Sequence, residues 1–222
     1  MSARDLSDPI LLELAKNGLD ALVDEMAIAL VRTAYSNNLK NAMDMSCALC
    51  DAEGHLIAQG LTLPLHLGSI PDAMAQVRKK FGSSLEPGDV FILNDPFSGG
   101  MHLPDIFVFK PIFCGGGLLA WAGTVCHHTD VGGRVPGSNA SDSTEIYQEG
   151  LRIPPLKLFD RGARNDTLWA LIERNVRVPV KVFGDLREIG FPTSIPSSSM
   201  WSRKLYTPSG NSRIAARVMR SE

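Results

Sequence analysis

Hydrophobic residues in the first part of the chain repeat with the period of an α-helix. Asp8-Pro9 is a typical helix start, because aspartate caps free backbone amides and proline fits the first turn. The apolar positions that follow recur mostly at helical spacing: Ile10, Leu11, Leu14, Leu22, Met26, Leu30 and Val31. The pattern therefore predicts a long amphipathic helix that Gly18 either kinks or splits.

The pattern changes to that of short strands after this helix. Residues 45–50 and 55–59 resemble strands and flank a turn over residues 51–54, which predicts a β-hairpin. Ser69-Ile70-Pro71 is then predicted to cap a second helix, with Ser69 as the capping residue, and we expect this helix to end near Phe81. The N-terminal part of the chain is therefore predicted to combine helices with paired strands.

Three apolar runs follow, at residues 90–93, 106–113 and 118–125. Only the glycine triplet 115–117 joins the last two runs, so they are predicted to pair as antiparallel strands. The residues before the first strand of this hairpin and after its second strand would then lie at the same end. With a short helix expected at residues 167–174, the pattern predicts an α+β fold. We expect an N-terminal helix, then a mixed, largely antiparallel sheet with hairpins and short helices.

Polar residues gather at the shared end of this predicted hairpin. Five of them could act as ligands or catalytic groups: His102, Asp105, His127, His128 and Asp130. An imidazole and a carboxylate three residues apart, with a third ligand from the next strand, would leave part of a divalent cation's coordination shell open. This spacing indicates a catalytic rather than a structural metal site. The alternative is that each residue is an ordinary solvated loop residue or turn cap.

Four other roles allow two interpretations each. Asp130 could orient an imidazole by accepting its second N–H, or cap the turn into Gly132-Gly133. Asp95 could serve the site or form a turn. His66 could line the pocket or be a hydrogen-bonded histidine at a helix entry, and Arg134 could hold an anionic substrate or be solvated.

Cys47 and Cys50 form a C-x-x-C pair. A structural zinc site would need a second pair at similar spacing, and only the isolated Cys114 and Cys126 follow. A redox pair would need its first cysteine at a helix N-terminus, whereas residues 45–50 have a strand pattern. We therefore expect two ordinary buried or half-buried thiols.

The composition is that of an ordinary globular protein. The 222 residues are 44% hydrophobic and 21% charged, which is enough for a core and for one or two domains. A net charge of −2 gives no sign of a nucleic-acid surface. Residues 1–8 lack the features of a signal peptide, and no apolar run reaches membrane-spanning length. With four cysteines that suit reduced thiols, these features predict a cytoplasmic protein.

Several segments resemble the hydantoinase B/oxoprolinase family. They are Met45–Leu49, Leu63–Gly68, Asn94–Asp105, His127–Gly133, Gln148–Pro155 and Asn175–Pro179. The likeness runs from about residue 8 to about residue 186, and members of this family are much longer than this chain. The resemblance implies a truncated, partial domain of that family at residues 1–186. Residues 187–222 depart from it as a basic, Ser/Pro-rich tail that we expect to be disordered.

The resemblance also implies an activity and its partners. It implies a B-type subunit that opens cyclic amides such as hydantoins or 5-oxoproline, in a hetero-oligomer with an ATP-using hydantoinase A-type subunit. Related members carboxylate ketones. In these carboxylases a divalent metal is held by a His-x-x-Asp pair and a later histidine, a pattern that falls here on His102, Asp105 and His127.

The roles of the remaining site residues follow from this ligand set. His128 is the alternative third ligand, and His128 and Asp130 are the catalytic candidates beside the metal. Imidazole and carboxylate ligands suit zinc, manganese or iron equally. There are two alternatives. One is a truncated, inactive protein that keeps only the fold and the binding of its partner, and the other is a subunit of a related ATP-dependent ketone carboxylase.

Overall fold

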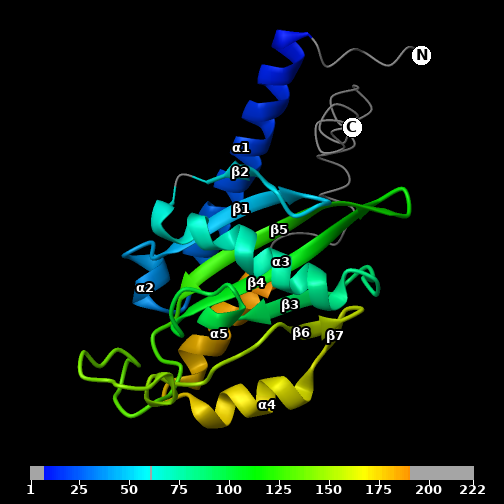
Figure 1. Cartoon of the computed structure of the whole chain (residues 1–222). Helices are drawn as coiled ribbons and strands as arrows, with labels where there is room; N and C mark the ends of the chain where they lie inside the picture. Colours follow the sequence, from blue (N-terminus) through cyan, green and yellow to red (C-terminus); the bar gives the residue numbers. More distant parts are fainter. Residues whose placement is uncertain (1–7, 61, 191–222) are drawn as a thin grey trace.

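A computed structural model describes residues 8–60 and 62–190 of the chain. Figure 1 shows helices packed on both faces of one central sheet. In chain order the elements are α1 (Pro9–Thr33), α2 (Asn37–Lys40), β1 (Met45–Asp51), β2 (Leu56–Gln59), the 3₁₀ turn η1 (Pro64–Ser69), α3 (Ile70–Phe81), β3 (Val90–Leu93), η2 (Pro96–Ser98), β4 (Asp105–Cys114), β5 (Gly117–His127), η3 (Ile146–Gln148), β6 (Leu156–Asp160), β7 (Ala163–Arg164), α4 (Asp166–Asn175) and α5 (Pro179–Gly190).

The seven strands form one sheet in the order β2-β1-β5-β4-β3-β6-β7. Every neighbouring pair is antiparallel. The α+β class and both expected hairpins, β1–β2 and β4–β5, are confirmed. The long β4–β5 hairpin lies in the middle of the sheet, with β1 paired to β5 on one side and β3 paired to β4 on the other.

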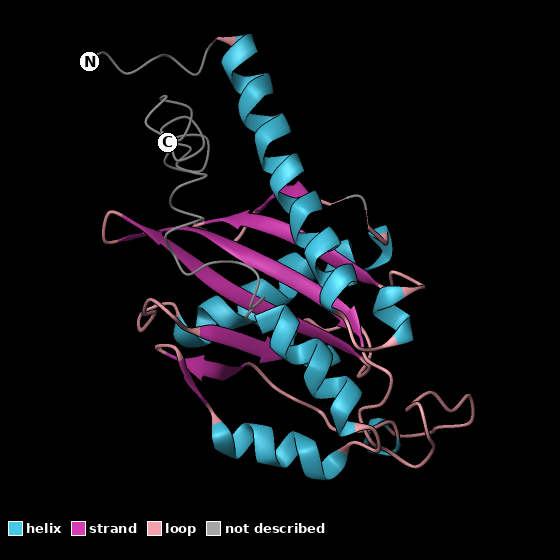
Figure 2. Cartoon of the chain, turned by 180° about the vertical axis from the view of Figure 1, so that it is seen from behind, coloured by secondary structure: helices cyan, strands magenta, loops and turns pink. Residues whose placement is uncertain are grey.

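Both faces of the sheet are covered. Helix α3 packs on one face over Phe91, Phe107 and Trp121, and lies in front of the sheet in Figure 1. Helices α1 and α5 cover the other face, as the view from behind in Figure 2 shows. Because both faces are covered, β1 is buried along its whole length and its sequence lacks a regular alternation of polar and apolar residues.

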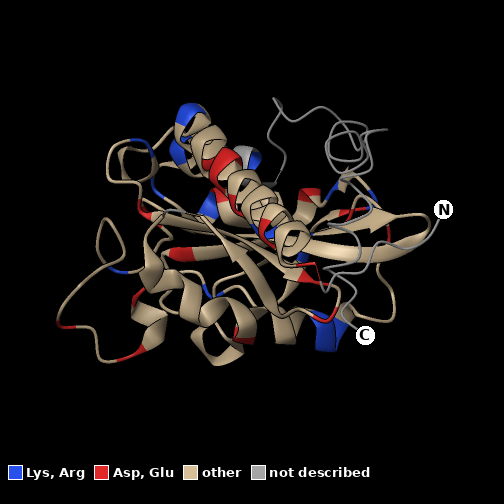
Figure 3. Ribbon diagram, turned by 90° about the horizontal axis from the view of Figure 1, so that it is seen from above, with Lys and Arg blue, Asp and Glu red and all other residues tan. Residues whose placement is uncertain are grey.

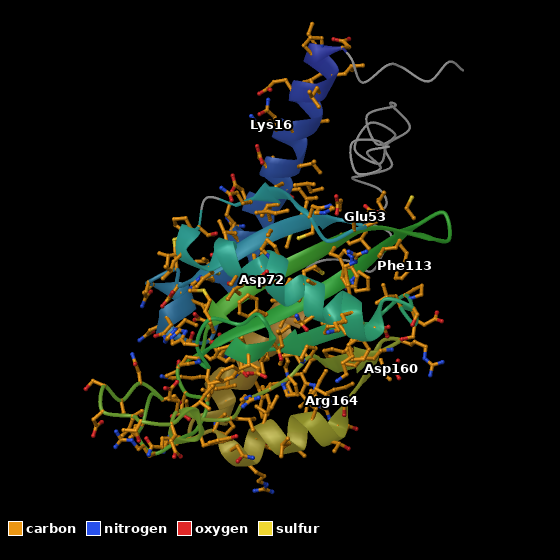
Figure 4. The ribbon with its side chains drawn as sticks, in the orientation of Figure 1. Lys16, Glu53, Asp72, Phe113, Asp160 and Arg164 are labelled. Carbon is orange, nitrogen blue, oxygen red and sulfur yellow. The ribbon has the colours of Figure 1, made fainter. Side chains whose placement is uncertain are left out.

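Helix α1 is one continuous helix through Gly18, so the split allowed by the sequence does not occur. Asp8 caps it as expected, accepting a hydrogen bond of 2.9 Å from the Ile10 N–H. Its buried side chains begin at Ala15. The first turns of the helix extend beyond the sheet, and Figure 4 labels Lys16 just after them. Gly18 is itself exposed, and a glycine at such a position costs about 1 kcal/mol relative to alanine, which does not end a long helix.

Helix α3 begins at Ile70 as expected, but Ser69 does not cap it. The Ser69 hydroxyl instead donates to the carbonyl oxygen of His66, at 2.7 Å. The capping interpretation of Ser69 is therefore wrong. A 3₁₀ turn precedes the helix and places His66 beneath it, because the turn continues directly into α3.

Acidic and basic residues are interspersed along the described ribbon, and α1 carries both kinds (Figure 3). Within residues 8–60 and 62–190, no helix is long and apolar enough to cross a membrane. Most of the tail expected at residues 187–222 lies outside the described residues, as does nearly all of the N-terminal segment considered as a signal peptide.

Candidate metal centre

The β4–β5 hairpin carries the two segments that hold most candidate residues. Gly115 and Gly116 turn the chain with φ angles of 59° and 84°, a left-handed region that glycine adopts without a side-chain clash. Figure 4 labels Phe113 near this turn, at the end of β4 remote from Asp105. The two strands pair back from the turn until Asp105 lies opposite His127. The shared end expected from the sequence is therefore present.

Three candidate ligands converge there, on the face of the sheet that α3 covers. Asp105 and His127 lie two residues from Phe107 and Val125, which pack beneath α3, so strand alternation directs all four side chains to that face. His102 approaches from the turn before β4. One ligand atom each from His102, Asp105 and His127 lies within 4.8 Å of the others. This spacing is compatible with one ion at about 2.0 to 2.3 Å from each ligand.

Asp105 is almost fully enclosed, with 1% of its side chain exposed. His102 Nδ1 lies 2.6 Å from its Oδ2, and His127 Nδ1 lies 3.1 Å from its Oδ1. Burial alone would raise the pKa of this carboxyl, but hydrogen bonds from the two imidazoles outweigh burial and hold the pKa at about 2. The hydrogen bond to Asp105 also raises the pKa of His127, against the effect of burial. At neutral pH Asp105 is an anion, the form that binds cations.

Two further polar residues border this group. His66 is buried, and its Nε2 lies 3.7 Å from Asp105 Oδ2 and 3.6 Å from Asp44 Oδ1. The Ser46 hydroxyl donates to the Leu63 carbonyl, so it accepts from His66 Nδ1 at 3.2 Å and orients the ring. His66 is therefore a hydrogen-bonded histidine at the entry to a helix, and it also lies beside the candidate ligands. No local pattern marks Asp44, because β1 reaches the site only through its pairing with β5.

Asn94 holds the segment that carries His102. Its buried side-chain amide donates to the carbonyl oxygens of Leu103 and Leu151, at 2.7 and 2.9 Å, and its side-chain oxygen accepts from the Ile153 N–H at 2.6 Å. These bonds join the connection between β3 and β4 to the chain before β6. Asn94 therefore fixes the backbone next to a candidate ligand.

The neighbouring Asp95 serves its own turn. Its Oδ1 accepts from the Phe97 N–H at 3.0 Å and its Oδ2 accepts from the Ser98 hydroxyl at 3.0 Å. The Arg152 guanidinium lies 2.9 Å from Oδ1. These contacts favour the turn interpretation of Asp95.

His128 is directed away from the three candidate ligands. It lies two residues after Cys126, which packs on the face covered by α1 and α5. The ring is fully buried, and neither ring nitrogen has a hydrogen-bond partner among the described residues. Burial lowers the pKa of His128 to about 4, so the ring is neutral at pH 7. The structure does not bring His128, the alternative ligand and catalytic candidate, to His102 and Asp105.

Asp130 fixes the loop that follows β5. Its Oδ1 accepts from the N–H groups of Gly132 and Arg177, and its Oδ2 accepts from the Gly137 N–H and the Arg177 guanidinium. Burial alone would raise the pKa of Asp130, but these hydrogen bonds outweigh burial and lower the pKa. The contacts favour the turn interpretation over an orienting role toward an imidazole. Arg134 pairs with Asp142 in the same loop.

Cys47 and Cys50 are free thiols. They pack on opposite faces of β1, Cys47 against the cluster under α1 and Cys50 against the cluster under α3. Burial raises the pKa of each thiol to about 12. The expectation of two ordinary buried thiols is confirmed, since residues on opposite faces cannot share one ion.

Comparisons with known proteins match most of the chain. A sequence model described as hydantoinase B/oxoprolinase matches residues 8–189. The beta chain of the caprolactamase from Pseudomonas jessenii is 41% identical over 181 residues, which cover 81% of this chain and 31% of that one. The 5-oxoprolinase of Saccharomyces cerevisiae is 41% identical over 147 residues, which cover 66% of this chain and 11% of that enzyme.

A solved structure shares the fold. The ATP-dependent caprolactamase from Pseudomonas jessenii superposes with a TM-score of 0.83 at 35% identity, covering 97% of this chain and 37% of that one. The chain therefore spans about a third or less of the length of these similar proteins.

Proposed function

The chain belongs to the hydantoinase B/oxoprolinase family, and from that premise we propose that it is the N-terminal, metal-binding part of a B-type subunit of an ATP-dependent cyclic-amide hydrolase. The reaction would open a ring such as hydantoin or 5-oxoproline. The similar proteins include a caprolactamase and a 5-oxoprolinase, both named for cyclic amides.

The observation that carries this proposal is the convergence of His102, Asp105 and His127. Their donor atoms suit a zinc, manganese or iron ion, and Asp105 is already ionised at neutral pH because its pKa is about 2. A divalent cation bound there would polarise the carbonyl group of an amide, which is a poor electrophile on its own. His66 and Ser46 would support Asp105 from the enclosed side.

The proposed partner is a hydantoinase A-type subunit that uses ATP, in a hetero-oligomer located in the cytoplasm. This proposal draws on two similar proteins that are named as parts of larger assemblies. They are the beta chain of the caprolactamase and a putative D-/L-hydantoinase from Pseudomonas sp. that is named as a B-type subunit. The solved caprolactamase is itself described as ATP-dependent.

Metal analysis of the purified 222-residue chain tests the metal site. We expect one divalent metal ion per chain, lost in Asp105→Asn because the neutral amide removes the buried charged ligand. The same substitution at Asp166, an exposed residue of α4, should leave the metal content unchanged. Cys50→Ala should also leave it unchanged. Metal retained in Asp105→Asn would contradict the assignment of the site.

A ring-opening assay with hydantoin and with 5-oxoproline, in the presence of ATP and the A-type subunit, tests the activity. We expect ring opening only when ATP, the A-type subunit and the metal-loaded chain are all present. Binding of the metal and of the A-type subunit without ring opening would instead support a fragment that keeps only the fold and its partner.

A further inference from the structure

Two buried polar side chains lie in the layer between the sheet and α5, the helix seen from behind in Figure 2. His128 directly follows β5, Asp185 belongs to α5, and the two residues are 0% and 1% exposed. Six buried side-chain nitrogen or oxygen atoms of the described residues have no hydrogen-bond partner. Three of the six belong to this pair, namely both ring nitrogens of His128 and Oδ2 of Asp185. Folded proteins leave few such atoms unpaired, so the pair needs a physical explanation.

The two side chains are close in space although they do not touch. Burial lowers the pKa of His128 most, and the charged group that opposes this effect most strongly is Asp185, ahead of Asp105. A charge acts in this way only over a short distance. No hydrogen bond joins the ring to Oδ2 of Asp185. The gap between them is therefore wider than one hydrogen bond and still narrow enough for electrostatic contact.

The other oxygen of Asp185 fixes the carboxylate in place. Oδ1 accepts from the Tyr35 N–H at 2.7 Å and from the Ser36 N–H at 3.1 Å. Ser36 is the residue that caps α2. The neighbouring Gly184 packs so closely on the Tyr35 side chain that a Cβ atom has no room there. Asp185 therefore cannot turn toward another donor without breaking two hydrogen bonds.

The His128 ring is held by its backbone. The His128 N–H donates to the Pro104 carbonyl at 2.8 Å. Cys126, two residues earlier on the same face, packs in the cluster beneath α1 and α5. A neutral imidazole has one N–H donor and one acceptor nitrogen, whereas a carboxylate only accepts. The ring therefore has a donor to offer and the carboxylate has an oxygen to receive one, but neither can move to the other.

One water molecule supplies the missing connection. It accepts the imidazole N–H and donates to the carboxylate, and two bonds of about 2.8 Å span a gap of up to about 5.5 Å. Enclosing a water costs less than leaving both groups desolvated and unpaired. A metal ion fits less well, because the group of described residues that is close enough to share one ion is His102, Asp105 and His127.

We propose that a water molecule is bound between the end of β5 and α5, where it accepts a hydrogen bond from the His128 ring and donates one to Asp185 Oδ2. This site is separate from the candidate metal centre and does not depend on the proposed function. The water joins α5 to the strand end that carries His127. Asp185 extends this connection to the start of α2, so one enclosed molecule ties three elements together.

X-ray crystallography of the full 222-residue chain tests the site directly. We expect a water about 2.7 to 3.2 Å from one ring nitrogen of His128 and from Asp185 Oδ2. His128→Leu should lose this water, because the leucine leaves it with one partner. His55→Leu is the matched control, since His55 also lies beside a carboxylate, that of Asp51, but is exposed. A ring bonded directly to Asp185, or a contact without water, would overturn the proposal.

Magnetic relaxation dispersion of the water ¹⁷O signal gives an independent test in solution, because it counts long-lived internal waters. We expect His128→Leu to hold one long-lived water fewer than the unchanged chain, and His55→Leu to hold the same number. Equal numbers in all three proteins would overturn the proposal. If His128→Leu does not fold, the crystal structure of the unchanged chain decides the question alone.

Amide hydrogen exchange tests the connection to α2. In His128→Leu the Oδ2 atom of Asp185 loses its partner, so the junction that Oδ1 holds should open to solvent more easily. We expect exchange of the Ser36 N–H to become at least about tenfold faster, and that of the Ile92 N–H in β3 to change by less than about threefold. The same factor at both amides would mean a general loss of stability and would overturn the connection.

Discussion

Two consecutive histidines show how strand alternation assigns different chemistry to neighbouring residues. His127 lies beside Asp105 and has a raised pKa, whereas His128 is buried on the other side and its pKa is lowered to about 4. A proton therefore favours the folded state at His127 and opposes it at His128. The two residues should respond to pH in opposite directions.

His128 should make the metal-free protein less stable in mild acid. Its folded pKa of about 4 lies below the ordinary value of 6.5, so the unfolded chain takes up the proton first as pH falls. The free energy of unfolding should therefore fall between about pH 6.5 and pH 4, by at most roughly 3 kcal/mol from this residue. Urea unfolding of the unchanged chain and of His128→Leu across this range measures the difference. Equal pH dependence of the two proteins would contradict the prediction.

Asn94 should contribute strongly to stability although it contacts no candidate ligand side chain. Asn94→Asp replaces the donor that serves Leu103 and Leu151 with a second acceptor, which leaves two carbonyl groups without a partner and places a charge in the core. We expect the free energy of unfolding to fall by about 3 kcal/mol or more. Urea unfolding measures it, and Asn41→Asp on the exposed turn after α2 is the control. A loss as small as that of the control would show that the three bonds contribute little.

Local sequence predicts only some of these residues. Asp105 and His127 are predictable as neighbours because one hairpin with a glycine turn brings them together. Asp44 and His66 are not predictable in this way, because they reach the site through the pairing of Met45 with Cys126. No turn in the sequence indicates that these two strands pair. The role of Asn94 also depends on Leu151 and Ile153, which are distant in sequence. Metal binding by His102, Asp105 and His127 stays a prediction.

At the scale of elements, the segment between β3 and β4 depends on one glycine. Gly99 has a φ of 85°, and a Cβ atom added there would lie 2.5 Å from the backbone nitrogen of Ala73 in α3. Gly116 in the β4–β5 turn has a similar φ of 84° but has nothing within 4 Å of such an atom. Substitutions at Gly99 and Gly116 would therefore cause similar backbone strain, but only a side chain at Gly99 would also collide with α3.

Gly99→Ala should destabilise the protein more than Gly116→Ala. Both variants carry the cost of a left-handed alanine, about 1 kcal/mol, but only the first must push the segment away from the backbone of α3. We expect the additional loss in Gly99→Ala to reach about 2 kcal/mol, of the size found for overpacked cores. Thermal or urea unfolding of the two variants provides the comparison. Equal losses would mean that α3 and this segment adjust without cost.

The elements themselves follow the sequence closely where the signal is local. Helix α1, the two hairpins and α4 lie where period and turn residues predict them. The capping role expected for Ser69 is wrong, because a 3₁₀ turn precedes the helix and the Ser69 hydroxyl donates to the His66 carbonyl within that turn. The order of strands in the sheet has no local signal, since β5 pairs with both β4 and the distant β1.

At the scale of the whole molecule, the start of α1 exposes large apolar side chains. Ile10 and Leu14 are 70% and 59% exposed, on the part of the helix that extends beyond the sheet (Figures 1 and 2). Apolar surface of this kind favours association. The buried side chains of the same helix, such as Leu22 and Val23, hold its second half against the sheet.

The double variant Ile10→Glu/Leu14→Glu should therefore reduce self-association of the chain without lowering its stability. Sedimentation at increasing protein concentration measures association, and urea unfolding measures stability. Leu19→Glu, which places a charge at a buried position of the same helix, should instead lower the free energy of unfolding by several kcal/mol. If the double variant associated as much as the unchanged chain, this end of α1 would not be the contact surface.

The β4–β5 ladder has its single irregularity between Ile112 and Phe113, next to the glycine turn. From Ile112 onward the pairing is regular down to Asp105 and His127. A shift of one residue along β5 would exchange His127 for His128 at the site and move an unpartnered imidazole out of the core. Because the bulge lies at the turn, an insertion or deletion among the glycines can be absorbed there before it reaches Asp105 and His127. This hairpin could therefore change its loop length over evolutionary time while the end that carries Asp105 and His127 kept the same partners.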